Sequence, residues 1–459
     1  MNPFTGGLKF LGTTAFNAVL ALLFFLFAAR YETPAFVGKV AILQLLEVIV
    51  GSFLTVMPYQ VVSREAAHAK GLDRKEDVSS TALGQALLVS PVLLFLFLFP
   101  SYLWMGIPYF VLYLYSTYQS SILQGMGLFT EANVGNVAFS LGRWGLSTIA
   151  VVERSVPLLI LVWTAGAAAK TVYYQLHLER PSFSLKVFGD VFRTGVPVYI
   201  TNAVAFLSGQ GDRVTTAYLL GSFSLGIYQF AALLAGVPAL LLNSLWGVVL
   251  PGVTYYTARG VDVRRASSLT LRLYFLLSLP LAAIGVGLAP PLVRELFPQY
   301  VPGLTSLELL VLFVTATSPF IALSNVIIAA KRDYRPLALI GVVSAAEVVV
   351  TSLLLIPRMG ILGAALSQVG NTVLTSALYL YFTVEQGLLS LGRRELVGIG
   401  LFGATFVSLW NPWIAFVLVL LGAKLGGLIS RADLTSLRSF IPPSLSFLGR
   451  VIEAMALDW

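Results

Sequence analysis

The stretch VPVYITNAVAFLSGQGDRVTTAYLLGSFSLGIYQFAALLAG, residues 196–236, decides the fold, because it is apolar for almost its whole length. About 20 residues of helix cross the hydrocarbon core of a bilayer, so the stretch is long enough for more than one span. It carries only two formal charges, on the neighbours Asp212 and Arg213. A charge at bilayer depth costs about 3 kcal/mol or more unless it is paired or hydrated. The stretch therefore predicts membrane helices with a site inside the membrane.

The composition extends this prediction to the whole chain. Hydrophobic residues make up 57% of the 459 residues and charged residues 11%, whereas about a quarter of a soluble domain is charged. We predict an all-α polytopic membrane protein with fourteen spans. The predicted spans are 8–29, 36–60, 79–99, 103–123, 133–152, 156–176, 195–219, 225–249, 267–289, 304–328, 336–356, 361–383, 395–411 and 413–430. Only Asn411 and Pro412 divide the last two, and a merged pair would give thirteen spans and an outer C-terminus.

The distribution of Lys and Arg predicts the orientation. With the N-terminus inside, 20 basic residues fall at inner helix ends and loops, and 5 fall at outer ones. Short loops that keep positive charge stay cytoplasmic, so both termini are predicted inside. The same loops account for the net charge of +8 without a nucleic-acid partner. No cleavable signal peptide is apparent, because Met1 to Lys9 leads into a segment of full spanning length.

The residue types argue against several kinds of chemistry. The chain has no cysteine, which excludes thiolate catalysis and Cys metal sites, and its two histidines, His68 and His177, fall at predicted cytoplasmic loops. We therefore predict no metal site and no cofactor. No predicted outer loop exceeds about 16 residues, whereas a membrane glycosyltransferase or polymerase would need a sizeable outer loop or an acidic metal-binding motif. The sequence favours a protein that is not an enzyme.

Internal similarity predicts two lobes. A shift of 188 residues sets Gly38 in GKVAILQLLEVIVGSFLTV against Gly226 in GIYQFAALLAGVPALLLNS, and a shift of 204 sets Arg154 against Arg358. Repeats in transporters commonly place the substrate between the two copies. We expect an N-lobe over residues 1–176 and a C-lobe over 185–385, followed by an appended region, 386–459. That region holds the last two spans and a tail that lies as an interfacial helix on the inner leaflet.

Small and polar side chains form one face on each of the first, second, seventh and eighth predicted helices. Asn17, Gln44, Gln229 and Asn243 are the larger polar members. Such faces suit the wall of a central hydrated cavity. Glycine and alanine alone would equally suit close helix packing in lipid.

Five formal charges fall at bilayer depth: Glu47, Arg143, Asp212, Arg213 and Glu347. Asp212 and Arg213 point about 100° apart on a helix, so each needs a partner elsewhere. Asp212 could pair with Arg143, and the 204-residue shift sets Arg143 opposite Glu347 as an interlobe pair or a gate.

Lys170 and Lys424 lie near cytoplasmic helix ends, where a long side chain can reach the interface, and they are not counted as deep charges.

Four stretches together resemble one family of transporters. They are DRVTTAYLLGSFSLGIYQFAALLAG from Asp212, LQGMGLFTEANV from Leu123, LFPQYVPGLTSLELL from Leu296 and IPRMGILGAALSQVGNT from Ile356. They are similar to the Wzx-type polysaccharide-export flippases of the multidrug/oligosaccharidyl-lipid/polysaccharide (MOP) superfamily, and the resemblance covers nearly the whole chain. It implies two six-helix lobes around a central cavity, with two added C-terminal helices. It also implies transfer of a polyprenyl-diphosphate-linked oligosaccharide to the outer leaflet of the cell membrane by alternating access, driven by an ion or by the membrane potential.

That substrate suggests roles for particular side chains. Arginine suits a diphosphate and amide or phenol groups suit sugar hydroxyls. The predicted substrate-binding residues are Arg213, Arg143, Arg30, Arg64, Asn17, Gln44, Asn202, Tyr228, Gln229 and Asn243. Asp212, Glu47 and Glu347 are the candidates for coupling to Na⁺ or H⁺. Membrane lipids are the other expected partners, and we expect a monomer.

The deep charges nearly cancel, which departs from the strongly cationic cavity expected of such flippases. A multidrug or organic-cation exporter and a lipid II flippase of the same superfamily stay open as alternatives.

Overall fold

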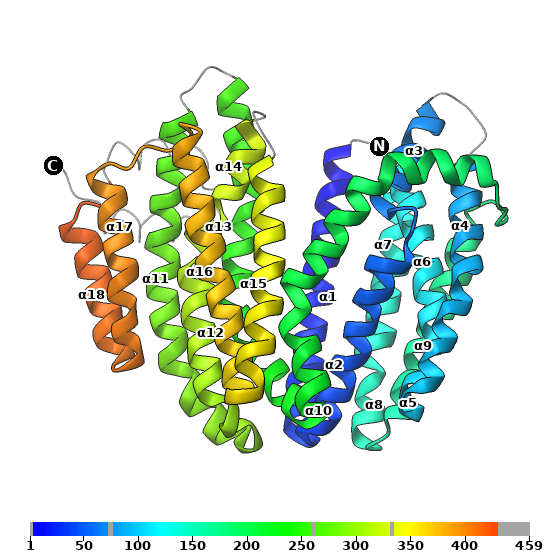
Figure 1. The fold of residues 1–459 in the computed structure, drawn as a ribbon, viewed down its shortest axis with the longest axis horizontal. Helices are drawn as coiled ribbons and strands as arrows, with labels where there is room; N and C mark the ends of the chain where they lie inside the picture. The colour runs from blue at the N-terminus through cyan, green and yellow to red at the C-terminus, as the bar shows by residue number, and fades with distance from the viewer. Residues whose placement is uncertain (1–2, 72–76, 259–262, 331–334, 430–459) are drawn as a thin grey trace. The chain divides into compact units, whose positions relative to one another are not determined.

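The computed structural model describes residues 3–71, 77–258, 263–330 and 335–429, which are almost entirely helical and include no strand (Figure 1). The helical elements in chain order are α1 (Pro3–Tyr31), α2 (Pro34–Ile49), η1 (Val50–Leu54), α3 (Tyr59–Gly71), α4 (Asp77–Val89), η2 (Ser90–Leu98), α5 (Ser101–Trp104), α6 (Ile107–Gly125), α7 (Phe129–Ser140), η3 (Leu141–Gly145), α8 (Ser147–Val152), α9 (Val156–Gln175), α10 (Leu185–Ala258), α11 (Val263–Leu296), η4 (Pro298–Gly303), α12 (Leu304–Ala316), α13 (Ser318–Ile321), α14 (Leu323–Ala330), α15 (Arg335–Met359), α16 (Ile361–Glu385), α17 (Arg393–Ala404), η5 (Thr405–Leu409) and α18 (Pro412–Leu425). The predicted all-α class is confirmed. The predicted C-terminal tail lies outside the described residues.

Local sequence fixes where several helices begin. Proline occupies the first turn of α2, α9 and α18, where its missing N–H costs no hydrogen bond. The residue before each of these helices caps it through a side-chain oxygen, and the caps are Thr33, Ser155 and Asn411. Asn411 accepts from the amides of Trp413 and Ile414, both at 3.1 Å. α17 and α18 are therefore two helices that pack against each other, and not one merged span.

The long helix α10 is broken at Gly221. The backbone there has φ of 76° and ψ of −178°, in the left-handed region that glycine adopts without strain. The deciding stretch thus forms two helices that meet at one residue with no loop between them. Because no loop separates the two helices, the sequence shows no run of charged residues between the two spans.

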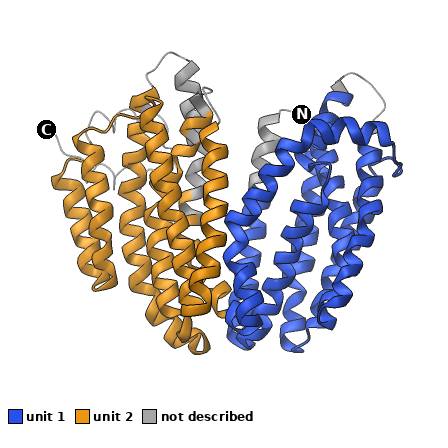
Figure 2. Cartoon of the chain, in the orientation of Figure 1, with its two compact units in different colours: residues 1–226 blue, residues 227–459 orange. Residues whose placement is uncertain are grey.

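The chain consists of two compact units, residues 1–226 and 227–459 (Figure 2). In the first unit α6 packs against α3, α4 and α9, and α1 packs against α7. The part of α10 that contains Asp212 and Arg213 belongs to this unit. The predicted lobes, 1–176 and 185–385, follow the repeat and stay a prediction.

The second unit is built around α11 and the pair α15 and α16. α11 packs against α12, α17 and α18, and α15 packs against α16. A buried ion pair, Arg272 Nε to Glu395 Oε1 at 3.2 Å, joins α11 to α17, and Glu395 also accepts from the amide of Gly392 at 3.0 Å. The ion pair fixes α17 to α11, and α18 packs against both helices.

Two glycines allow a close backbone approach in the first unit, between α2 and the segment after Gly221. A Cβ atom on Gly38 would overlap the carbonyl oxygen of Ser222. A Cβ atom on Gly226 would overlap the carbonyl oxygen of Pro34. Any side chain at either position would push the two segments apart.

Within the described residues, nine helical stretches are long and apolar enough to cross a membrane. One of them, Leu185–Ala239, has 55 residues and includes the break at Gly221, so it covers two predicted spans. Two shorter apolar helices, Ser318–Ile328 and Pro412–Leu425, add to these. The molecule is a multi-pass membrane protein, and the count of fourteen spans stays a prediction.

Candidate functional site

The site in the first unit is centred on Arg143, which lies in η3, a π-helical turn between α7 and α8. A π-turn widens the helix by one residue and leaves backbone groups to be bonded by other partners, and such turns are frequent at functional sites. Here the hydroxyl of Ser147 donates to the carbonyl oxygen of Arg143. The indole N–H of Trp163 donates to the Ser147 hydroxyl at 3.0 Å. The turn is thereby tied to α9.

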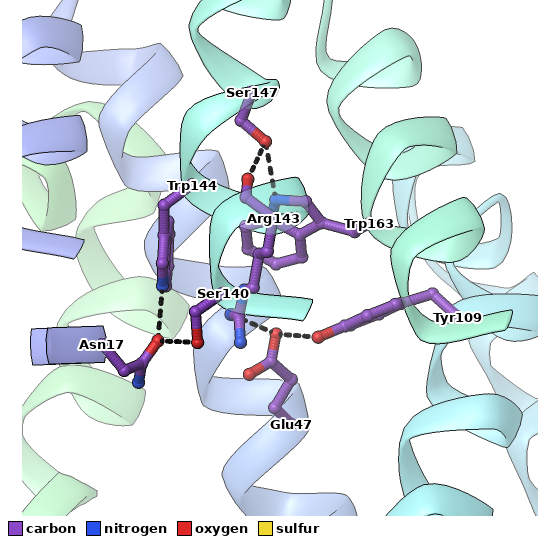
Figure 3. Close-up of polar contacts among 8 residues, drawn as sticks. All are labelled: Asn17, Glu47, Tyr109, Ser140, Arg143, Trp144, Ser147 and Trp163. Carbon is purple, nitrogen blue, oxygen red and sulfur yellow. Dashed lines mark hydrogen bonds and ion pairs between the residues drawn. The ribbon is translucent and has the colours of Figure 1, made fainter. Parts of the chain in front are cut away.

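Arg143 forms a buried ion pair with Glu47, which comes from α2. Arg143 Nη2 lies 2.5 Å from Glu47 Oε1, and each side chain is 8% exposed. The hydroxyl of Tyr109 on α6 donates to the same carboxylate oxygen at 2.7 Å. The three elements that meet at this oxygen, α2, α6 and η3, are shown in Figure 3. A buried charge pair of this kind is stable only when further hydrogen bonds satisfy its atoms, and Tyr109 supplies one.

Aromatic rings surround the guanidinium of Arg143. Its Cζ atom lies 4.1 Å from the ring centroid of Trp163 and 4.3 Å from that of Trp144. Both distances are in the range of favourable cation–π contact. Its buried Nε has no hydrogen-bond partner in the described part of the chain. Arg143 is therefore held by one carboxylate and by ring faces, with a donor left over.

Asn17 on α1 orients one of these rings. Its Oδ1 accepts from the indole N–H of Trp144 at 2.9 Å and from the hydroxyl of Ser140 at 2.8 Å (Figure 3). The sequence grouped Asn17 with sugar-binding residues. In the structure its oxygen fixes Trp144 against Arg143, so Asn17 belongs to the same cluster.

Lys170 was set aside in the sequence as a residue near a helix end, yet it lies beside this cluster. Its Nζ is 5.0 Å from the ring centroid of Phe139 and 5.5 Å from that of Tyr174. It interacts electrostatically with both Glu47 and Arg143. The sequence did hold a signal: residues 163, 167, 170 and 174 form one stripe of α9 at spacings of four, three and four, and its other members are buried aromatic or small residues.

Asp212 and Arg213 make local contacts in α10. Asp212 is buried, and its Oδ1 accepts from the amide of Arg213 at 2.8 Å. Arg213 Nη1 donates to Gln210 Oε1 at 2.7 Å, and its buried Nε has no hydrogen-bond partner among the described residues. The sequence left open a pair between Asp212 and Arg143, but the carboxylate partner of Arg143 is Glu47.

A second polar cluster lies in the other unit, where α15 meets α16. Ser344 donates to Asn371 Oδ1 at 2.6 Å, and the hydroxyls of Thr351 and Ser367 lie 2.6 Å apart. Glu347 is half-buried in this seam, and its Oε2 has no hydrogen-bond partner in the described residues. A half-buried carboxylate with an unbonded oxygen can accept a proton or a small cation.

The other predicted residues are dispersed. Arg30 and Arg64 are exposed, and Arg64 pairs with its neighbour Glu65 at 2.6 Å. Asn202 accepts from Gln60 at 3.1 Å. Gln44 is half-buried, whereas Tyr228 and Gln229 are buried. The side chain of Asn243 lies outside the described residues.

Comparisons with known proteins identify the fold. A family model described as "Polysaccharide biosynthesis protein" matches residues 118–300. The chain is similar to a structure titled "Lipid II flippase MurJ, inward closed conformation", with a TM-score of 0.69 and 14% identity over 91% of this chain and 98% of that one. It is also similar to an inward-facing multidrug resistance MATE family transporter of the MOP superfamily, with a TM-score of 0.65 and 14% identity over 81% of this chain and 95% of that one. No curated protein matches the sequence. The chain has the fold of these transporters, as the sequence predicted.

Proposed function

We propose that this protein is a flippase for a polyprenyl-diphosphate-linked oligosaccharide, which it moves from the cytoplasmic to the outer leaflet by alternating access. One observation carries the proposal: the segment that matches the polysaccharide biosynthesis family, residues 118–300, lies in a transporter fold and includes the buried Arg143 and the half-buried Arg213. Guanidinium groups suit the diphosphate of such a lipid. The protein is then a transporter and not an enzyme, it resides as a monomer in the cell membrane, and both termini are cytoplasmic.

Transfer of the lipid-linked sugar is measured in proteoliposomes, with purified protein and a polyprenyl-diphosphate oligosaccharide. Wild type is expected to make the sugar accessible on the opposite leaflet. Failure to move it, with export of organic cations instead, would favour the multidrug exporter. A strict preference for a peptide-bearing lipid II over other lipid-linked sugars would favour the lipid II flippase.

Arg213→Ala is expected to slow this transfer roughly tenfold or more, because a hydrogen bond to a charged group contributes about 1.5–3 kcal/mol. The Nε donor of Arg213, which lacks a partner among the described residues, supports a role in holding an anion. Arg393→Ala, at an exposed position at the start of α17, is the matched control. A rate equal to that of wild type would assign Arg213 a structural role.

We further propose that Glu47, Asp212 and Glu347 include the residues that couple transport to Na⁺ or H⁺, with Glu347 as the first to test. Glu347→Gln is expected to keep gradient-independent transfer and to lose the acceleration by an imposed Na⁺ or H⁺ gradient. The exposed Glu385→Gln is the control. Transfer rates are compared with and without each gradient. A variant that responds to both gradients as wild type does would exclude Glu347 from coupling.

A further inference from the structure

The cluster around Arg143 contains more positive than negative charge. Two cations, Arg143 and Lys170, interact with one carboxylate, Glu47. Oε1 of that carboxylate already accepts two hydrogen bonds, from Arg143 at 2.5 Å and from Tyr109 at 2.7 Å. Among the residues that the structure describes, one positive charge of this cluster therefore has no carboxylate of its own.

In the described part of the chain, the direct contacts of the Lys170 ammonium are with aromatic rings. Among the described residues its ammonium contacts the faces of Phe139 and Tyr174, and it makes neither a hydrogen bond nor an ion pair. An ammonium group has three donors, and a half-buried one without acceptors is costly in a membrane. A lysine that merely extends along the helix to the interface would place these donors in water.

One aromatic ring links the two cations. The centroid of Phe139 lies 5.0 Å from Lys170 Nζ and 5.7 Å from Arg143 Cζ. Phe139 lies at the end of α7 and Arg143 in the π-turn η3 that follows it. The two positive groups thus border the same ring, and Arg143 still has the unbonded Nε donor.

We propose that Arg143 and Lys170, which both border the ring of Phe139, form a binding site for a phosphate or diphosphate group. Glu47 positions the guanidinium of Arg143 without contacting the anion. Diphosphate oxygens accept several charge-assisted hydrogen bonds, so the group can engage the ammonium of Lys170 and the free donor of Arg143 together. The proposal deepens the proposed function and rests on it in one respect: the diphosphate is that of the carrier lipid.

Binding of simple probes to the full-length protein in detergent tests the site. The probes are farnesyl diphosphate, inorganic diphosphate and farnesol. Isothermal titration calorimetry measures the affinity of the protein for each probe. Lys170→Met keeps the aliphatic contacts and removes the charge, and Lys170→Arg keeps the charge. Lys424→Met is the matched control, because Lys424 is also near the end of an apolar helix but is exposed.

We expect Lys170→Met to weaken binding of farnesyl diphosphate tenfold or more, Lys170→Arg to restore most of it, and Lys424→Met to bind as wild type does. Equal competition by inorganic diphosphate would mean that the site recognises the anion alone, whereas selective binding of farnesyl diphosphate would assign it to a lipid headgroup. The thermal midpoint of each variant shows whether it is folded. Wild-type affinity in a folded Lys170→Met, or equal binding of farnesol and farnesyl diphosphate by wild type, would overturn the site.

The same preparations separate this proposal from the flippase function. If wild type transfers lipid-linked sugar and Lys170→Met binds the diphosphate normally, the flippase function is supported and the proposed site is disproved. If wild type transfers no sugar and Lys170→Met binds the diphosphate more weakly than wild type does, the proposed site is supported and the flippase function is disproved.

Discussion

Glu47→Ala is expected to destabilise the protein by about 3–5 kcal/mol, the usual cost of removing one partner from a buried ion pair. The substitution leaves Arg143, 7% exposed, among Trp144 and Trp163 with no carboxylate. Tyr109 loses its acceptor as well. The measurement is the temperature at which purified protein in detergent loses its monodisperse peak in size-exclusion chromatography.

Two further variants show that the effect comes from the pair. Glu47→Gln keeps an acceptor for Tyr109 and is expected to cost less than Glu47→Ala. Glu47→Gln combined with Arg143→Met removes both charges. The double variant is expected to lose less stability than the sum of the losses of the two single variants, because residues in contact are not independent. Wild-type stability of Glu47→Ala would contradict the ion pair.

Gly226→Ala is expected to abolish transport and to lower the yield of folded protein severely. Its Cβ atom would overlap the carbonyl oxygen of Pro34, a backbone atom that no rotamer change can move. Relief requires α2 to separate from the segment that follows Gly221. Overpacking usually costs about 1–3 kcal/mol, and an overlap with backbone is expected to reach the upper end of that range or exceed it. Folded yield and proteoliposome transfer are measured together.

Gly209→Ala is the matched control. Gly209 also lies in α10, but a Cβ atom there meets nothing within 4 Å. Alanine is favoured over glycine in a helix interior by about 1 kcal/mol, so this variant is expected to be as stable as wild type or more so. If Gly226→Ala behaved like Gly209→Ala, the close approach of the two segments would be disproved.

Composition and hydropathy were sufficient to predict the helical membrane class, because each span must satisfy its own backbone in lipid. The transporter fold was implied by the resemblance to the polysaccharide-export flippases. Depth in the membrane also identified Glu47 and Arg143 as unusual. Their pairing could not be read from the sequence. The two residues lie 96 positions apart in different helices, and their meeting depends on how α2 packs in the first unit.

Two other features were hidden for different reasons. The π-turns at Val50–Leu54 and Leu141–Gly145 each change the direction of the following side chains, which a regular spacing of three and four residues cannot anticipate. Lys170 was judged by its distance from a helix end. The face of α9 on which Lys170 lies decides its contacts, because the stripe it shares with Trp163 and Tyr174 points toward Arg143 and Phe139.

The 188-residue shift relates the two glycine contacts of α2 and α10. Adding 188 to Pro34 gives Ser222, and adding 188 to Gly38 gives Gly226. The contact of Gly38 with the Ser222 carbonyl and that of Gly226 with the Pro34 carbonyl are thus one contact repeated with the copies exchanged. Each glycine approaches the carbonyl group that lies four residues before the other glycine. All four residues belong to the first unit, so a change at either glycine is limited by the backbone of the segment that faces it.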